Sequence, residues 1–170
     1  MNRLALVCLA LAFGLGLHAN AGLVWAQSDL NGAWEIVEAS GHNAQGDWKL
    51  ENVQPSLYIF MDGYYSIAQV NGNEARPLMP EGTTWDTMTE EQLSSVCSAA
   101  VFSANSGTYE VDGSSLTTKP MVAKWPNFME GGSASHTYLV ENDMLTLSQE
   151  GDGWNSTIEL RRLHAKHNPR

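Results

Sequence analysis

Apolar and polar positions alternate along this chain over short stretches that end at turn-forming dipeptides. In the clearest stretch, Tyr109 and Val111 fall on one face of a strand with a two-residue period. Asp112-Gly113 follows, a dipeptide suited to a tight hairpin turn, and Leu116 begins a second strand. The same unit recurs along the chain. The pattern predicts eight strands, at 32–38, 57–60, 64–70 and 108–111, from 116 onward, and at 135–141, 144–149 and 154–162.

One segment has helical periodicity instead. Thr89 and Gln92 have the spacing of a capping box, and two glutamates occupy the first turn. The pattern predicts a helix over 89–104, whose apolar stripe must lie on the face or open end of a sheet. Cys97, within the stripe, is expected to be a buried and unreactive thiol. The stripe comprises Leu93, Val96, Cys97, Ala100, Val101 and Ala104.

Nearly all of the predicted strands are joined by short turns, so consecutive strands are expected to be antiparallel. Eight such strands close readily into an up-and-down barrel, which leaves no unpaired edge. The sequence therefore predicts an all-β protein, an eight-stranded antiparallel up-and-down β-barrel with one helix inserted between the third and fourth strands. A barrel of this size is just wide enough to hold side chains or one small ligand.

The first residues have the pattern of a signal peptide. Asn2-Arg3 precede an apolar run over 4–17, which is short for a bilayer span. Cleavage after Ala26 is favoured over cleavage after Ala21, because it also removes an apolar tail; an uncleaved anchor is the alternative. We expect a periplasmic or secreted bacterial protein with no membrane span after cleavage. Its parts would be a signal peptide at 1–26, a barrel domain at 27–163 and a disordered tail at 164–170.

Charge and cysteine content narrow the set of partners. The formal net charge is −10 at pH 7, which argues against nucleic acid and anionic membrane surfaces, because both require clustered Lys and Arg. Without the signal peptide, Cys97 is the one cysteine left, so no disulfide within the chain is expected. No motif names a reaction or a cofactor. His164 and His167 are one helical turn apart without a third ligand, so no metal site is predicted.

Five segments, taken in order, resemble the bacterial lipocalin-like domain proteins, which are small eight-stranded barrels. They are 30–34, 57–66, 106–113, 138–147 and 160–163. The resemblance spans essentially the whole mature chain, although Asn142 stands where the family usually has Gly. It implies a barrel that can enclose a cavity, without an assigned activity. It also implies that Trp34 packs against an arginine of the last strand to close the barrel, and the two-residue period favours Arg162 over Arg161.

Aromatic residues are the candidate lining of such a cavity, because ligand pockets are mostly apolar with a few polar groups. Trp85 and Trp125 lie in long loops that would cover an open barrel end. His136 shares the predicted inward face with Tyr138 and could orient a ligand or transfer a proton. A core filled by these side chains is the alternative. The predicted ligand-binding residues are Tyr58, Phe60, Tyr65, Trp85, Tyr109, Trp125, His136 and Tyr138.

The leading hypothesis is a barrel that binds a small lipophilic molecule beneath the helix and the loops at one end. One alternative is a barrel enzyme of the isomerase or hydratase type, with His136 and a tyrosine as its proton-transfer pair. Another is a protein-interaction module with a solid interior. The sequence identifies neither the ligand nor a catalytic residue.

Overall fold

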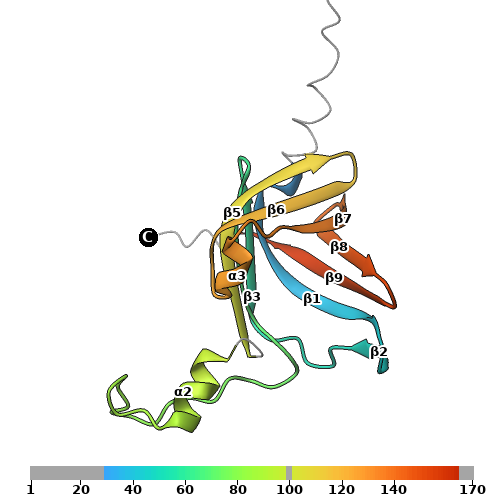
Figure 1. Cartoon of the computed structure of the whole chain (residues 1–170). Helices are drawn as coiled ribbons and strands as arrows, with labels where there is room; N and C mark the ends of the chain where they lie inside the picture. The colour runs from blue at the N-terminus through green and yellow to red at the C-terminus, as the bar shows by residue number, and fades with distance from the viewer. Residues whose placement is uncertain (1–28, 99–100, 165–170) are drawn as a thin grey trace, which may run out of the picture.

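The computed structural model describes residues 29–98 and 101–164 (Figure 1). The predicted signal peptide with its cleavage sites, and the tail from 165 onward, lie outside the described residues. Within these ranges the structure has the helices α2 (Glu90–Cys97) and α3 (Pro126–Met129). The strands are β1 (Gly32–Asn43), β2 (Gly46–Lys49), β3 (Ser56–Met61), β4 (Tyr64–Val70), β5 (Phe102–Asp112), β6 (Ser115–Ala123), β7 (Ala134–Glu141), β8 (Met144–Gly151) and β9 (Trp154–Leu163).

Eight of these strands form a closed antiparallel ring, which confirms the predicted fold class. The order runs from β1 through β3 to β9, and β9 pairs back with β1, where Trp34 lies opposite Arg162. The short strand β2 extends the sheet by pairing with the far end of β1. Asp62 and Asn142 adopt positive φ angles of 48° and 56° in two of the tight turns. Asn142 therefore takes the left-handed conformation for which Gly is usually needed.

The two ends of the barrel are built differently. The closed end carries the start of β1 and the turns that join β3 to β4, β5 to β6 and β7 to β8. Toward the open end the strand ladders are incomplete. β1 pairs with β3 only through 32–34, and a β-bulge between Ile36 and Glu38 bends β1 beyond that point. β6 pairs with β7 only through Ser115 to Thr118, so the rest of β6 faces α3 instead.

The hydrophobic core lies at the closed end. Trp34 and Phe60 are fully buried, and the rings of Phe60 and Tyr109 meet edge to face with centroids 5.4 Å apart. Full burial of a large apolar side chain stabilises the fold by about 1.5–3 kcal/mol, so this cluster dominates the packing energy. Its buried members are Leu30, Trp34, Tyr58, Phe60, Tyr65, Tyr109, Leu116, Leu145, Leu147 and Leu160.

The helix predicted over 89–104 is correct at its start and wrong at its end. Thr89 and Gln92 form the predicted capping box, but α2 ends at Cys97, and Phe102 begins β5. Residues 102–105 pair with 67–70 of β4, and this ladder overrides the helical spacing of the apolar residues. No residue of α2 is buried, and Cys97 is exposed rather than buried. The expectation that an apolar helical face packs on the sheet is therefore wrong.

The open end is bordered by α3 instead of by α2. In Figure 1, α2 stands away from the barrel at the lower left, whereas α3 lies against β6. The long loop predicted to hold Trp125 is thus partly wrong, because β6 continues to Ala123 and α3 begins at Pro126. The first predicted strand, 32–38, is likewise too short, because β1 continues to Asn43 and β2 begins at Gly46. No helix in the described part of the chain is long and apolar enough to cross a membrane.

A bulge shapes the segment of β6 that leads to the open end. The register of β5 and β6 shifts between Ser106 and Gly107. A Cβ atom on Gly107 would lie 2.0 Å from the carbonyl oxygen of Lys119, so only glycine permits this close approach. Pro120, which lacks an amide donor, sits opposite Gly107 at the bulge. The bulge brings the end of β6, and with it α3, to the mouth of the barrel.

Candidate functional site

Trp34 and Arg162 seal the closed end of the barrel. The guanidinium of Arg162 lies 4.0 Å from the centre of the Trp34 ring, a contact that contributes about 0.5–2 kcal/mol. It also donates hydrogen bonds to the backbone oxygens of Asn31, at 2.6 Å, and Asp29, at 2.8 Å. The indole Nε1 of Trp34 donates to the backbone oxygen of Leu30 at 2.9 Å. The start of the barrel is thereby tied to its last strand.

Polar contacts complete this closed end. The side chain of Asn31 donates to Asp62 Oδ1 at 3.2 Å and accepts from the backbone N–H of Asp62 at 3.1 Å. The hydroxyl of Tyr109 donates to Asn31 Oδ1 at 3.4 Å. Arg161 points to the outside and pairs with Glu35, so Arg162 is the arginine on Trp34. The closed end is a structural seal rather than a binding site.

An inner cavity of about 190 Å³ occupies the open half of the barrel. This volume is many times the roughly 10–15 Å³ that one water molecule needs, so the barrel is not filled solid here. It is smaller than the range of about 300–1,000 Å³ that ligand pockets usually have. The cavity is lined by Tyr58, Phe60, Ile67, Gln69, Ser103, Asn105, Leu116, Thr118, Phe128, Ala134, His136, Leu147 and Ile158.

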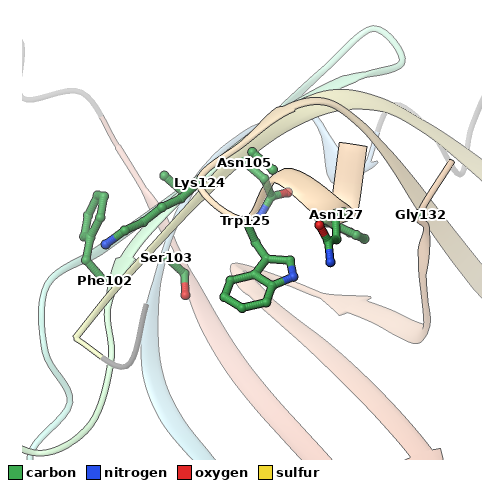
Figure 2. A pocket seen from close by; sticks show the side chains of 10 residues that line it. Phe102, Ser103, Asn105, Lys124, Trp125, Asn127 and Gly132 are labelled. Atoms are coloured by element: carbon green, nitrogen blue, oxygen red, sulfur yellow. The ribbon is translucent and has the colours of Figure 1, made fainter. Parts of the chain in front are cut away.

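A second chamber, of about 440 Å³, lies at the mouth of the barrel beside α3 (Figure 2). Ser103, Asn105 and Phe128 line both this mouth chamber and the inner cavity, so the two adjoin. Figure 2 shows that the indole of Trp125 projects from the segment between β6 and α3. The exposed fraction of Trp125 is 59%. The mouth chamber is lined by Phe102, Ser103, Ala104, Asn105, Ala123, Lys124, Trp125, Asn127, Phe128 and Gly132.

The sequence of α3 explains how Phe128 comes to stand between the two chambers. Pro126 occupies the first helical position, where its fixed φ and missing N–H are tolerated. Gly131 follows the helix with a φ of +79°, which reverses the chain toward β7. A Cβ atom on Gly132 would lie 2.7 Å from the ring of Phe128. The absence of a side chain at Gly132 therefore leaves room for the Phe128 ring between the inner cavity and the mouth chamber.

A chain of hydrogen bonds runs across β3, β4 and β5 toward the mouth. The Tyr58 hydroxyl donates to Gln69 Oε1 in a short contact. Gln69 Nε2 donates to Asn71 Oδ1 at 2.7 Å, and Asn71 Nδ2 donates to Ser103 Oγ at 2.8 Å. Burial raises the pKa of Tyr58, so its hydroxyl stays a neutral donor. These groups satisfy one another and fix the wall of the cavity.

Two buried polar atoms have no hydrogen-bond partner within 29–98 and 101–164, the Tyr65 hydroxyl oxygen and His136 Nδ1. Burial lowers the pKa of His136, which keeps its imidazole neutral at pH 7. Burial raises the pKa of Tyr65; the nearby Thr118 opposes the rise, but no hydrogen bond of normal geometry joins the two. An unpartnered buried polar group costs about 1–3 kcal/mol. A molecule in the cavity that supplies a partner would therefore be favoured.

Four of the predicted ligand-binding residues border the two chambers. Tyr58, Phe60 and His136 line the inner cavity, and Trp125 lines the mouth chamber. They come from β3, β7 and the segment between β6 and α3. The barrel thus brings together side chains that are up to 78 positions apart in sequence, since Tyr58 and His136 share one cavity wall.

The other four lie elsewhere. Tyr65 and Tyr109 are buried in the core at the closed end, and Tyr138 packs against that core, where burial raises its pKa. Trp85 is 70% exposed and borders a groove between α2 and β5. This groove adjoins the mouth chamber, because Phe102, Ala104 and Lys124 are among the residues that line both.

The groove beside α2 is held by two cations around Phe102. Arg76 and Lys124 lie over this ring at 5.1 and 5.2 Å. Arg76 also donates to the backbone oxygen of Val96 at 3.3 Å, and Lys124 to that of Ser98 at 2.9 Å. Both charges therefore satisfy carbonyl groups at the C-terminal end of α2. These contacts hold only the C-terminal end of α2 near β5 and β6.

Sequence reasoning missed the polar residues that line the cavity. Ser103 and Asn105 were hidden because the helix prediction extended to 104. The two-residue period of β5, followed backward from Tyr109 through Gly107, leads to both positions. Thr118 follows in the same way from Leu116 on β6.

The remaining described histidines lie at the surface. His42 Nδ1 lies 2.7 Å from Asp47, and His164 Nε2 lies 3.1 Å from Asp143; His167 lies outside the described residues. Among the residues that the structure describes, no group of three His, Cys, Asp or Glu side chains is arranged to hold a metal ion.

Comparison with known proteins gives two structural neighbours. A lipocalin-like protein from Bacteroides uniformis matches with a TM-score of 0.43 and 15% sequence identity, and an uncharacterized protein from Bacteroides eggerthii with a TM-score of 0.42 and 11% identity. Each alignment covers 79% of this chain and 99% of the neighbour. The chain matches no protein-family model and no curated protein sequence.

Proposed function

We propose that this protein is a periplasmic or secreted barrel that binds one small, mostly apolar molecule across the inner cavity and the mouth chamber. The observation that carries the proposal is the junction of the two chambers at Ser103, Asn105 and Phe128. The inner cavity alone is below the usual range of ligand pockets, whereas the mouth chamber that it adjoins lies within that range. A ligand in the mouth chamber has room to extend into the inner cavity.

The lining supports an apolar ligand. Phe60, Leu116 and Leu147 form part of the inner wall, and Trp125 borders the mouth. A few polar groups stand among them, which is the composition of a ligand pocket.

Tryptophan fluorescence tests the proposal. The mature chain is titrated with retinol, palmitate and menadione, which cover three classes of lipophilic molecule. We expect at least one to change the emission in a saturable way with one site per chain, because Trp125 borders the mouth chamber. A flat response to the whole panel, checked by calorimetry, would contradict the proposal.

Two variants identify where the ligand lies. Trp125→Phe is expected to reduce the fluorescence change while binding persists by calorimetry. Trp154→Phe is the matched control, since Trp154 borders a different surface pocket beside His42 and Glu150. Loss of the signal in the Trp154 variant but not in the Trp125 variant would place the ligand outside the mouth chamber.

The proposed location has its own test. The basic start, apolar run and small residues of 1–26 support export. Mass spectrometry of the protein from its native host should give a mature chain that begins at Gln27 or Gly22. A chain that retains 1–26 would contradict a cleaved signal peptide.

A further inference from the structure

The inner cavity joins an apolar wall to hydrogen-bonding atoms that the described residues leave unpartnered. His136 lines the cavity, and its Nδ1 is buried without a partner within 29–98 and 101–164. The buried hydroxyl of Tyr65 also has no hydrogen-bond partner among the described residues. It lies near Thr118, and Thr118 lines the cavity. Strand register brings these groups together, because His136 pairs with Leu116 and the next inward position on β6 is Thr118. A hydrogen-bonding occupant is therefore favoured over a pure hydrocarbon.

The charge of the cavity restricts what that hydrogen-bonding group can be. No Lys, Arg, Asp or Glu is among the described residues that line the inner cavity, and burial lowers the pKa of His136. A carboxylate or ammonium group would lose its hydration there without meeting an opposite charge. Lys124, which lines the mouth chamber, already donates to the Ser98 carbonyl and lies over the Phe102 ring. The site fits a neutral polar group.

The mouth chamber indicates the direction of the ligand. Phe102, Ala104, Ala123, Trp125 and Phe128 contribute apolar lining there. Asn105 lines both chambers, so its amide lies at their junction. Hydrocarbon is better accommodated toward the mouth, and the unpartnered atoms are deeper, along β7 and β6.

We propose that the inner cavity binds the neutral, oxygen-bearing end of the ligand, an alcohol, phenol or ketone group, at His136, with the hydrocarbon part extending under Trp125. This inference rests on the proposed function, because it assigns a polarity and a direction to the same ligand. It would make the barrel selective among lipophilic molecules of similar size.

Three matched probes test it by calorimetry at pH 7.5: 4-propylphenol, propylbenzene and 4-propylbenzoate. They share one hydrocarbon frame and differ in carrying a neutral hydroxyl, no polar group or a carboxylate, which is ionised at this pH. We expect 4-propylphenol to bind about tenfold more tightly than propylbenzene, the size of a net hydrogen bond in a shielded site. The benzoate should bind most weakly.

Two variants assign the selectivity to His136. His136→Leu should bind propylbenzene as the parent does and lose the preference for the phenol. His136→Asn, which keeps a hydrogen-bonding atom near the place of Nδ1, should retain most of that preference. The midpoint of urea unfolding is measured for both variants, and if His136→Leu does not fold, the ranking of the probes on the parent protein decides.

The outcomes separate the two proposals. Equal binding of propylbenzene and 4-propylphenol, or a preference that survives in His136→Leu, would overturn this inference and leave ligand binding intact. Tightest binding of the benzoate would overturn the neutral end group. If no probe binds, and the wider lipophilic panel also fails, both proposals are wrong.

Discussion

The two ends of this barrel use similar side chains for opposite purposes. At the closed end, Trp34 is fully buried and carries Arg162 on its ring. At the open end, Trp125 is largely exposed over an adjoining pair of chambers. At the closed end, Arg162, Asn31 and Asp62 are hydrogen-bonded to neighbouring groups. At the open end, the buried Nδ1 of His136 has no partner among the described residues. One end stabilises the fold, and the other has the features of a site that needs an occupant.

Strand pairing underlies this difference. The closed end is crossed by tight turns and complete ladders, which draw inward side chains into contact. At the open end β1 leaves β3 after Trp34, and β6 leaves β7 after Thr118. The inner cavity lies in this half of the barrel, where the neighbouring strands separate. The packing energy is concentrated at one end and the free volume at the other.

Replacing the tryptophan at each end should give the largest contrast. Trp34→Ala removes a fully buried ring and its cation contact, and we expect a loss of about 3–5 kcal/mol in the free energy of unfolding. Trp125→Ala, at an exposed position, should change it by no more than about 0.5 kcal/mol. Urea unfolding followed by circular dichroism measures both. Similar losses in the two variants would show that the open end carries as much packing energy as the closed end.

The two adjacent arginines give the next contrast. Arg162→Met keeps an apolar stem but loses the stacking on Trp34 and the bonds to the carbonyls of Asn31 and Asp29. A loss of about 1.5–3 kcal/mol is expected. Arg161→Met breaks an exposed pair with Glu35 and should cost no more than about 1 kcal/mol. A larger loss for Arg161 would mean that the seal does not depend on Arg162.

Two tyrosine variants compare the loss of a hydrogen-bonded hydroxyl with the loss of a hydroxyl that has no partner. Tyr58→Phe leaves Gln69 Oε1 without its donor and should cost about 1–2 kcal/mol. Tyr65→Phe removes a buried hydroxyl that has no partner among the described residues, so stability should stay the same or rise slightly. Thermal or urea unfolding of the ligand-free protein gives both values. A clear loss for Tyr65→Phe would show that its hydroxyl has a partner in solution.

The sequence predicted the closed end better than the open end, and the reason is physical. Turn dipeptides such as Asp112-Gly113 and alternating positions such as Tyr109 and Val111 are local signals, and they fix the ring of strands. The open end depends on events that are not local. Residues 102–105 pair with β4, so α2 ends before them. The bulge between β5 and β6 bends the end of β6, and α3 follows that end. Phe128 lines the cavity because strands that are distant in sequence pair to form the opening beside which α3 lies.

His136 provides the smallest and most specific prediction. Burial lowers its pKa in the folded protein below the ordinary value of about 6.5 that it has in the unfolded chain. As the pH falls below about 6.5, the unfolded chain therefore binds the proton first, and stability declines until the pH passes the lower folded pKa. The pH dependence of urea unfolding, measured for the parent and for His136→Asn between pH 8 and pH 5, isolates this contribution because all other titrating groups are shared. The parent should lose more stability than the variant over that interval. If the two profiles are parallel, the imidazole of His136 is hydrated in the folded protein. The claim that its Nδ1 lacks a hydrogen-bond partner would then be wrong.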